Sequence, residues 1–95
     1  MLHTLTHSFS HVDAEALLRT VQRDDVLLLI QNGVTGATVK SSSLGAIIEK
    51  GVAVYALRED LEARGLLFRV IEEVTVVDCE GFVDLSVAHY PQMAW

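Results

Sequence analysis

The sequence predicts a small α/β protein, a three-layer α/β/α sandwich around a mostly parallel sheet of four or five strands. Three observations support this prediction. Residues 52–57 form a continuous apolar run with β-branched and aromatic side chains that is typical of a strand buried on both faces. Residues 58–65 follow at once with charged helix formers and end at Gly65, which suits a left-handed helix cap. Similar apolar runs alternate with helical patterns elsewhere, which indicates βαβ units with right-handed crossovers. At this length we expect the flavodoxin-like strand order 2-1-3-4(-5).

The amino-terminal half supplies the first two strands of this prediction. Residues 2–5 are a short first strand, and residues 11–22 a helix whose apolar side chains recur at helical spacing. Ser10 and Asp13 have the spacing of a capping box at its start, with Asp in place of the usual Glu or Gln. Residues 26–30 form a second buried strand, which ends at a turn containing Asn32 and Gly33, and residues 33–40 are predicted to be a loop.

The carboxyl-terminal half completes the alternation. Residues 41–43 offer serine caps for a helix that Gly51 ends, and the strand of residues 52–57 follows. Residues 73–77 are a fourth strand. Asp78 is expected to cap a last helix that Pro91 stops. The tail, residues 92–95, is either a fifth edge strand or an apolar plug.

Composition limits the classes of function. We expect residues 1–95 to form a single α/β domain. The hydrophobic fraction of 51% and mean hydropathy of +0.36 are high for a small monomer, so we expect an obligate oligomer with an apolar subunit interface.

Charge and cysteine content narrow the partners further. Seven Lys and Arg against 13 Asp and Glu give a net charge of −6 without a basic cluster, which argues against direct, stable nucleic-acid binding. The sequence has no signal-peptide pattern and no run of about 20 apolar residues, so we expect no membrane association. A single Cys fits a reducing cytoplasm.

The tip after the third predicted strand is where parallel α/β folds place ligands or nucleophiles. Here residues 57–60 contain no Cys, Ser, His or glycine-rich loop. Glu59 and Asp60 are neighbours on a helix and point about 100° apart, so they favour the helix dipole over an acid–base pair.

The single thiol is a second candidate. Cys79 near a helix start is suited to carry sulfur as a thiolate. Asp78 and Glu80 flank it, however, and their negative charge disfavours the thiolate. We favour an incidental thiol and leave the carrier alternative open.

Other candidate motifs are explained more simply as structural. His3, His7 and His11 share a four-residue spacing, but His3 falls in a strand and no acid or Cys completes a metal set, so surface or capping roles are expected. The two glycines in residues 31–36 match no phosphate-loop spacing. Trp95 is either a core plug or a subunit anchor. We therefore predict no catalytic, cofactor-binding or metal-binding residue, and no cofactor.

Four segments, in order and at matching spacing, resemble the TusB/DsrH family: residues 1–5, 25–34, 54–66 and 92–95. The resemblance covers essentially the whole chain. It implies a DsrE-like α/β domain and membership of a cytoplasmic heterohexamer built from three homologous subunits. Such a complex relays persulfide sulfur, in the Tus version to the 2-thio group of a tRNA wobble uridine and in the Dsr version in oxidative sulfur metabolism.

The resemblance also implies where the sulfur chemistry lies. The catalytic Cys belongs to the TusD/DsrE subunit, where the carrier TusE or DsrC docks. This chain has no Cys at its third-strand tip, and its first helix lacks the Cys of the DsrH branch. The resemblance thus implies a non-catalytic TusB-like subunit whose partners are TusC-like and TusD-like subunits, with a TusE-like carrier reached indirectly. Ser8 matches the family, whereas Phe9 replaces a frequent Pro.

Three alternatives stay open from the sequence. Cys79 is a persulfide carrier in the first, and the chain is a DsrH-like subunit in sulfur oxidation in the second. In the third it is a lone flavodoxin-like binder of a small anionic ligand.

Overall fold

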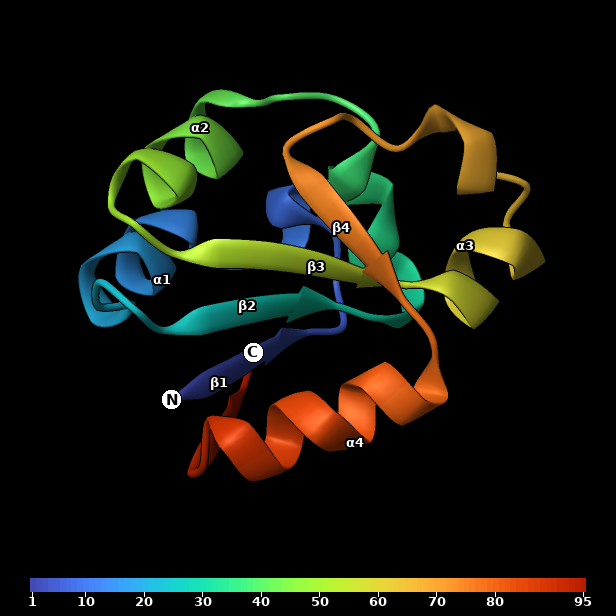
Figure 1. The fold of residues 1–95 in the computed structure, drawn as a ribbon. Helices are drawn as coiled ribbons and strands as arrows, with labels where there is room; N and C mark the ends of the chain where they lie inside the picture. Colours follow the sequence, from blue (N-terminus) through green and yellow to red (C-terminus); the bar gives the residue numbers. More distant parts are fainter.

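The computed structural model describes residues 1–95 as a five-stranded sheet with helices on both faces (Figure 1). All neighbouring strands pair in parallel. The strands are β1 (Leu2–Leu5), β2 (Val26–Leu29), β3 (Ala53–Leu57), β4 (Val74–Val77) and β5 (Gln92–Ala94). The α-helices are α1 (Ala14–Thr20), α2 (Ser42–Glu49), α3 (Arg58–Ala63) and α4 (Cys79–Ala88). Three 3₁₀ helices, η1 (Phe9–His11), η2 (Gln31–Ala37) and η3 (Leu67–Arg69), complete the chain.

The predicted fold class is confirmed, but the predicted strand order is wrong. The order is β4-β3-β2-β1-β5, whereas the expected flavodoxin-like order places the first strand between the second and third. Side chains of α1 and α2 belong to one core cluster, so both helices cover the same face of the sheet. Right-handed crossovers on one face move the chain in one direction across the sheet, so β1 to β4 follow in sequence.

Helix α4 alone covers the opposite face. It carries the chain back beneath the sheet, so that β5 pairs with β1 at the far side from β4 (Figure 1). A crossover in the reverse direction must lie on the other face to stay right-handed. The two termini consequently lie near each other (Figure 1).

The two faces are unequally filled. On the face of α1 to α3, 14 buried residues form the main core, among them Leu17 of α1, Ile47 of α2 and Leu61 of α3. On the face of α4 only Leu2, Val26 and Leu28 are buried together. The protein therefore has one thick apolar layer and one thin one.

Helix starts follow the predicted caps except in α1. The Ser41 hydroxyl accepts a hydrogen bond from the Leu44 amide of α2, and the Asp78 carboxylate accepts one from the Gly81 amide of α4 at 2.9 Å. In α1 the cap is Asp13, which accepts the Ala16 amide at 3.0 Å. The predicted start near residue 11 is wrong because η1 occupies that segment and Ser10 caps nothing.

Two further predictions are settled by the tail and by the segment after β2. The tail is an edge strand, β5, and the partly buried side chain of Trp95 packs against the main core. Residues 31–37 form η2 and not the turn and loop that were predicted.

The longest α-helix, α4, has ten residues, and no helix has both the length and the apolar character needed to cross a membrane.

Candidate functional site

The carboxyl ends of β3 and β4 form the switch point of the sheet. β3 leads into α3 on the main-core face, and β4 leads into α4 on the opposite face. Parallel α/β folds bind ligands in the crevice that opens between two such diverging connections. Here the crevice holds a hollow of about 300 Å³ lined by Arg58, Val76, Val77, Asp78 and Gly81.

The crevice brings Cys79 beside Glu59, although 20 residues separate them in sequence. Cys79 is exposed at the first turn of α4, and its amide donates to the Glu59 carboxylate over 3.4 Å. A hydrogen bond from the thiol to Glu59 raises the pKa of Cys79, and desolvation and the charges of Glu59, Asp78 and Asp60 act in the same direction. The thiol is therefore held in its protonated form.

The structure adds a third acidic side chain to the two that the sequence placed beside Cys79. A helix amino-terminus by itself favours a thiolate, because its partial positive charge stabilises the anion. The sequence identified Asp78 and Glu80 as opposing charges. In the structure the largest contribution comes from Glu59, which the sequence did not link to the thiol, and Glu80 does not contribute. Pairing of β3 with β4 is what brings Glu59 and Cys79 together.

Asp60 has a structural partner of its own. Its carboxylate accepts a hydrogen bond from the Gln31 amide at 2.7 Å and lies 3.9 Å from the Arg64 guanidinium. Arg64 also donates two hydrogen bonds to the Asn32 side chain, at 3.0 and 3.3 Å. Glu59 and Asp60 thus bind different neighbours: Glu59 holds the start of α4, and Asp60 fixes η2 against α3.

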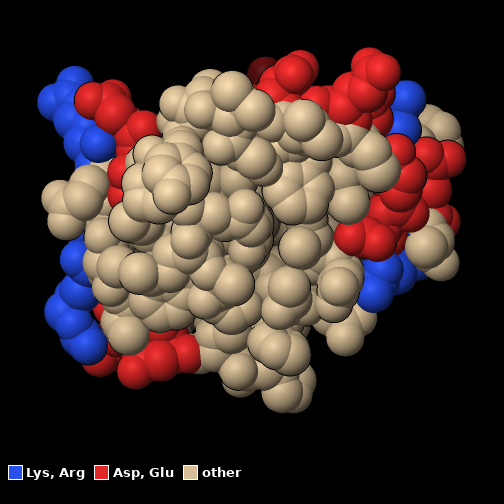
Figure 2. All heavy atoms as spheres, turned by 90° about the horizontal axis from the view of Figure 1, so that it is seen from below, with Lys and Arg blue, Asp and Glu red and all other residues tan.

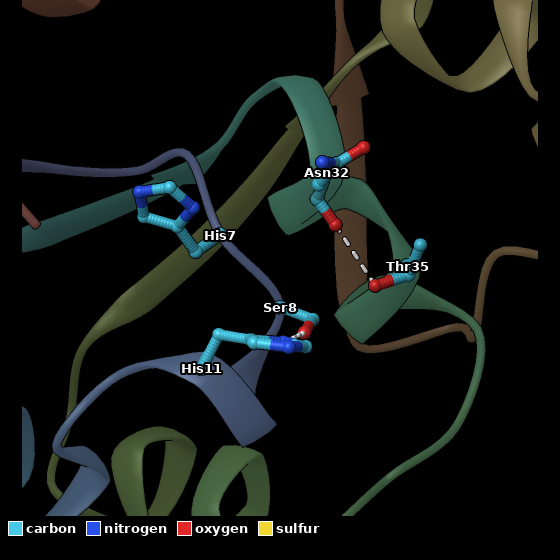
Figure 3. A pocket seen from close by; sticks show the side chains of 5 residues that line it. All are labelled: His7, Ser8, His11, Asn32 and Thr35. Atoms are coloured by element: carbon cyan, nitrogen blue, oxygen red, sulfur yellow. Dashed lines mark hydrogen bonds between the residues drawn. The ribbon is translucent and has the colours of Figure 1, made fainter.

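A second hollow of about 410 Å³ opens at the carboxyl ends of β1 and β2 (Figure 3). His7, Ser8 and His11 line one side, and Asn32 and Thr35 of η2 line the other. His11 Nδ1 lies 2.8 Å from the Ser8 hydroxyl, and the Thr35 hydroxyl donates to the Asn32 carbonyl. No group of three or more His, Cys, Asp or Glu side chains is placed to hold a metal ion.

His3 departs from the role predicted for it. A surface or capping role was expected, but the side chain is completely buried. The Trp95 indole N–H donates to its Nδ1 at 3.1 Å, and its Nε2 lies 2.9 Å from the Asp25 carboxylate. An indole N–H can only donate, so His3 Nδ1 carries no proton, and the proton of the neutral ring is on Nε2, where it is donated to Asp25.

Asp25, which the sequence did not single out, is the centre of this buried network. Its partial burial acts to raise its pKa, but hydrogen bonds from the Gln22 amide, His3 and the Met1 ammonium outweigh that effect and lower the pKa to about 2. The Met1 ammonium lies 3.0 Å from the carboxylate. Because Leu2 pairs with Val26, the start of β1 lies next to Asp25, so strand pairing is the only signal that predicts this contact.

Comparison with known proteins identifies the family. A family model described as "DsrH like protein" matches residues 7–92. The chain belongs to this DsrH-like family. The resemblance that the sequence segments predicted is therefore confirmed. Among its relatives, Protein TusB of Salmonella enteritidis and Protein TusB of Salmonella typhimurium are each 46% identical to it over 95 residues, 100% of both chains.

Solved structures share the fold. The ychN protein from E. coli superposes with a TM-score of 0.75, covering 99% of this chain and 97% of that one, at 10% identity, so the likeness concerns the fold alone. Protein Tm0979 from Thermotoga maritima, solved by NMR in solution, has a TM-score of 0.63 and 28% identity, and 93% of each chain is covered. The parallel five-stranded sheet is thus an architecture that other proteins also adopt.

Proposed function

We propose that this chain is a non-catalytic subunit of a cytoplasmic sulfur-relay complex that takes part in 2-thiolation of the tRNA wobble uridine. Its partners in this proposal are TusC-like and TusD-like sister subunits, and a TusE-like carrier reaches it only through the complex. Identity of 46% over the full length to proteins named TusB supports the proposal. The absence of a Cys in α1 favours the Tus branch of the resemblance over the Dsr branch.

The acidic surroundings of Cys79 at the switch point of the sheet are the structural observation that supports the non-catalytic role. Sulfur passes between proteins by attack of a thiolate, so a carrier Cys needs surroundings that lower its pKa. The tip of β3 has no thiol, and Glu59 raises the pKa of Cys79, the one thiol nearby. A persulfide-bearing Cys is therefore assigned to a sister subunit.

Thiolation of tRNA in cells tests this role. In a strain that lacks its own TusB, we expect the wild-type chain and Cys79→Ser to restore 2-thiouridine equally, measured by mass spectrometry of digested tRNA. A Cys-to-Ser exchange in the TusD-like subunit is the matched control and should abolish it. Loss of 2-thiouridine with Cys79→Ser, together with added sulfur on Cys79 in the wild type, would establish the persulfide-carrier alternative instead.

Assembly tests the partner part of the proposal. When the chain is co-expressed with TusC-like and TusD-like subunits and purified through a tag on one of them, all three should elute together. Separate elution of every subunit contradicts the proposal.

A further inference from the structure

Helix α4 carries large apolar side chains on the side that faces away from the sheet as well as on the side that faces it. Phe82 and Leu85 pack toward the sheet as partly buried members of the thin core layer. Val83 and Val87, on the other side, are 61% and 78% exposed. No residue of α4 is buried. Large apolar side chains that lie exposed side by side on a helix are typical of a surface that a partner covers.

The exposed side of α4 continues into the residues that follow it. Val83 and Val87 are four residues apart, which places them along one stripe of α4, and Tyr90 lies two residues beyond the end of the helix at Ala88. Tyr90 is 83% exposed. We call these three residues the α4 stripe. Seen from the side of α4, the middle of this face is uncharged and the charged side chains lie at its periphery (Figure 2).

Acidic residues run beside the α4 stripe. Glu80 and Asp84 are four residues apart and both exposed, so they form a second row on the outer side of the helix. Neither forms an ion pair, and α4 contains no Lys or Arg. An uncompensated pair of acids next to an apolar stripe suits a partner that places basic side chains opposite them.

We propose that the α4 stripe and its acidic row form a binding surface for a different subunit, one that presents an apolar face bordered by Lys or Arg. A second copy of this chain is the wrong occupant, because each copy has a net charge of −6 and would add to the acids of the other. The molecule measures 31 by 29 Å along its longer axes, so one of its faces can supply the roughly 800 Å² per partner that a stable interface buries. This inference rests on the proposed function, which supplies the sister subunits.

The test compares variants of the full chain, co-expressed with the TusC-like and TusD-like subunits. The double variant Val83→Lys with Val87→Lys should weaken retention on the tagged sister subunit by roughly tenfold or more, because it places charge in the centre of an interface. Val39→Lys is the matched control: Val39 is 64% exposed but lies outside α4, so its retention should equal that of the wild type. Circular dichroism of each isolated variant checks that the fold is unchanged.

The charge of the partner is tested separately. Glu80→Lys with Asp84→Lys should also weaken retention, and added salt should weaken binding of the wild type. Full retention of this variant, beside loss with the valine pair, would overturn the basic border assigned to the partner.

The remaining outcomes separate this inference from the proposed function. If the wild type is retained and the valine pair is retained as well, the inference fails and the proposed function stands. If the wild type itself is not retained, both fail. If light scattering shows that the isolated chain dimerises and that the valine pair abolishes dimerisation, the occupant is a second copy and the inference is overturned.

Discussion

At the scale of single residues, the contact of Cys79 with Glu59 determines the chemistry of the sheet's carboxyl edge. Glu59 raises the pKa of the exposed thiol. We therefore expect Glu59→Gln to lower that pKa and to speed alkylation of Cys79 by iodoacetamide near pH 8, roughly two- to fivefold, because the thiolate is the reacting species. Mass spectrometry of the alkylated chain over time gives the rate.

Glu80→Gln provides the control for this experiment. Glu80 is adjacent to Cys79 in sequence, but it is not among the groups that shift the thiol's pKa. Its rate of alkylation should match the wild type. Equal rates for Glu59→Gln and the wild type would mean that Glu59 does not hold the proton on the thiol.

Asp25 makes the stability of the protein depend on pH in the acid range. Its folded-state pKa is about 2, below the ordinary value of 3.8. A carboxyl whose pKa is lowered by folding stabilises the protein above its unfolded pKa, and this contribution is lost as the pH falls toward the folded pKa. The free energy of unfolding, measured by urea denaturation, should thus fall between about pH 4 and pH 2 more steeply in the wild type than in Asp25→Asn.

The exposed neighbour Asp24 serves as the comparison for Asp25. Asp24→Asn should keep the steep acid slope of the wild type. An identical slope in Asp25→Asn would show that the network around His3 does not depend on the ionised carboxylate.

At the scale of elements, η2 is fixed by a close approach at Gly33. A Cβ added there would collide with the carbonyl oxygen of Leu5 and lie 2.9 Å from its carbonyl carbon. Both groups are backbone and cannot move aside, so we expect Gly33→Ala to destabilise the protein by about 2–4 kcal/mol in chemical denaturation. The hollow between His7 and Asn32 should open with it, since η2 forms one of its walls.

Gly45 in α2 is the matched position for Gly33. A Cβ at Gly45 meets only the end of the Lys40 side chain, at 3.7 Å. Because alanine favours a helix more than glycine does, Gly45→Ala should be neutral or stabilise by up to about 1 kcal/mol. If both substitutions had the same effect, the packing of η2 on β1 would not be the cause.

The elements that the sequence predicted are those with local signals. Ser41 and Asp78 cap their helices as predicted, and Gly51 and Gly65 have the positive φ of 90° and 67° expected after a helix. The segment of η2 carries the same residue types as a turn, and its contacts with Leu5, Asp60 and Arg64, all distant in sequence, pack it as a helix. Local composition predicts caps and ends but not such a contact.

At the scale of the whole molecule, the strand order and the sites that depend on it could not be predicted. Strands such as β2 are buried on both faces, so their sequences are uniformly apolar and do not show which face a following helix covers. The order depends on that choice. The contact of Trp95 with His3 follows from the pairing of β5 with β1, which the expected order does not contain. The contacts of Glu59 with Cys79 and of His3 with Asp25 join strands that are neighbours in both orders, but they depend on the register of each pair, which the sequence does not show.

A contact between the two ends of the chain holds the edge strand β5 against β1. Trp95 is 92 residues from His3, donates its indole N–H to it, and has its own amide bound to the Thr4 carbonyl at 2.8 Å. Trp95→Phe keeps an aromatic plug but removes the N–H, which leaves His3 Nδ1 buried without a donor. We expect a loss of about 1–3 kcal/mol in the global free energy of unfolding.

The denaturation curve of Trp95→Phe distinguishes a tail that unfolds together with the whole sheet from a tail that frays locally. If the tail is part of one cooperative unit, the denaturation midpoint falls while the dependence on denaturant is unchanged. Tyr90→Phe, at a residue 83% exposed near the same tail, should leave the midpoint at the wild-type value. A shallower dependence in Trp95→Phe, with early exchange of the amide protons of β1 and β5, would mean that the tail opens independently.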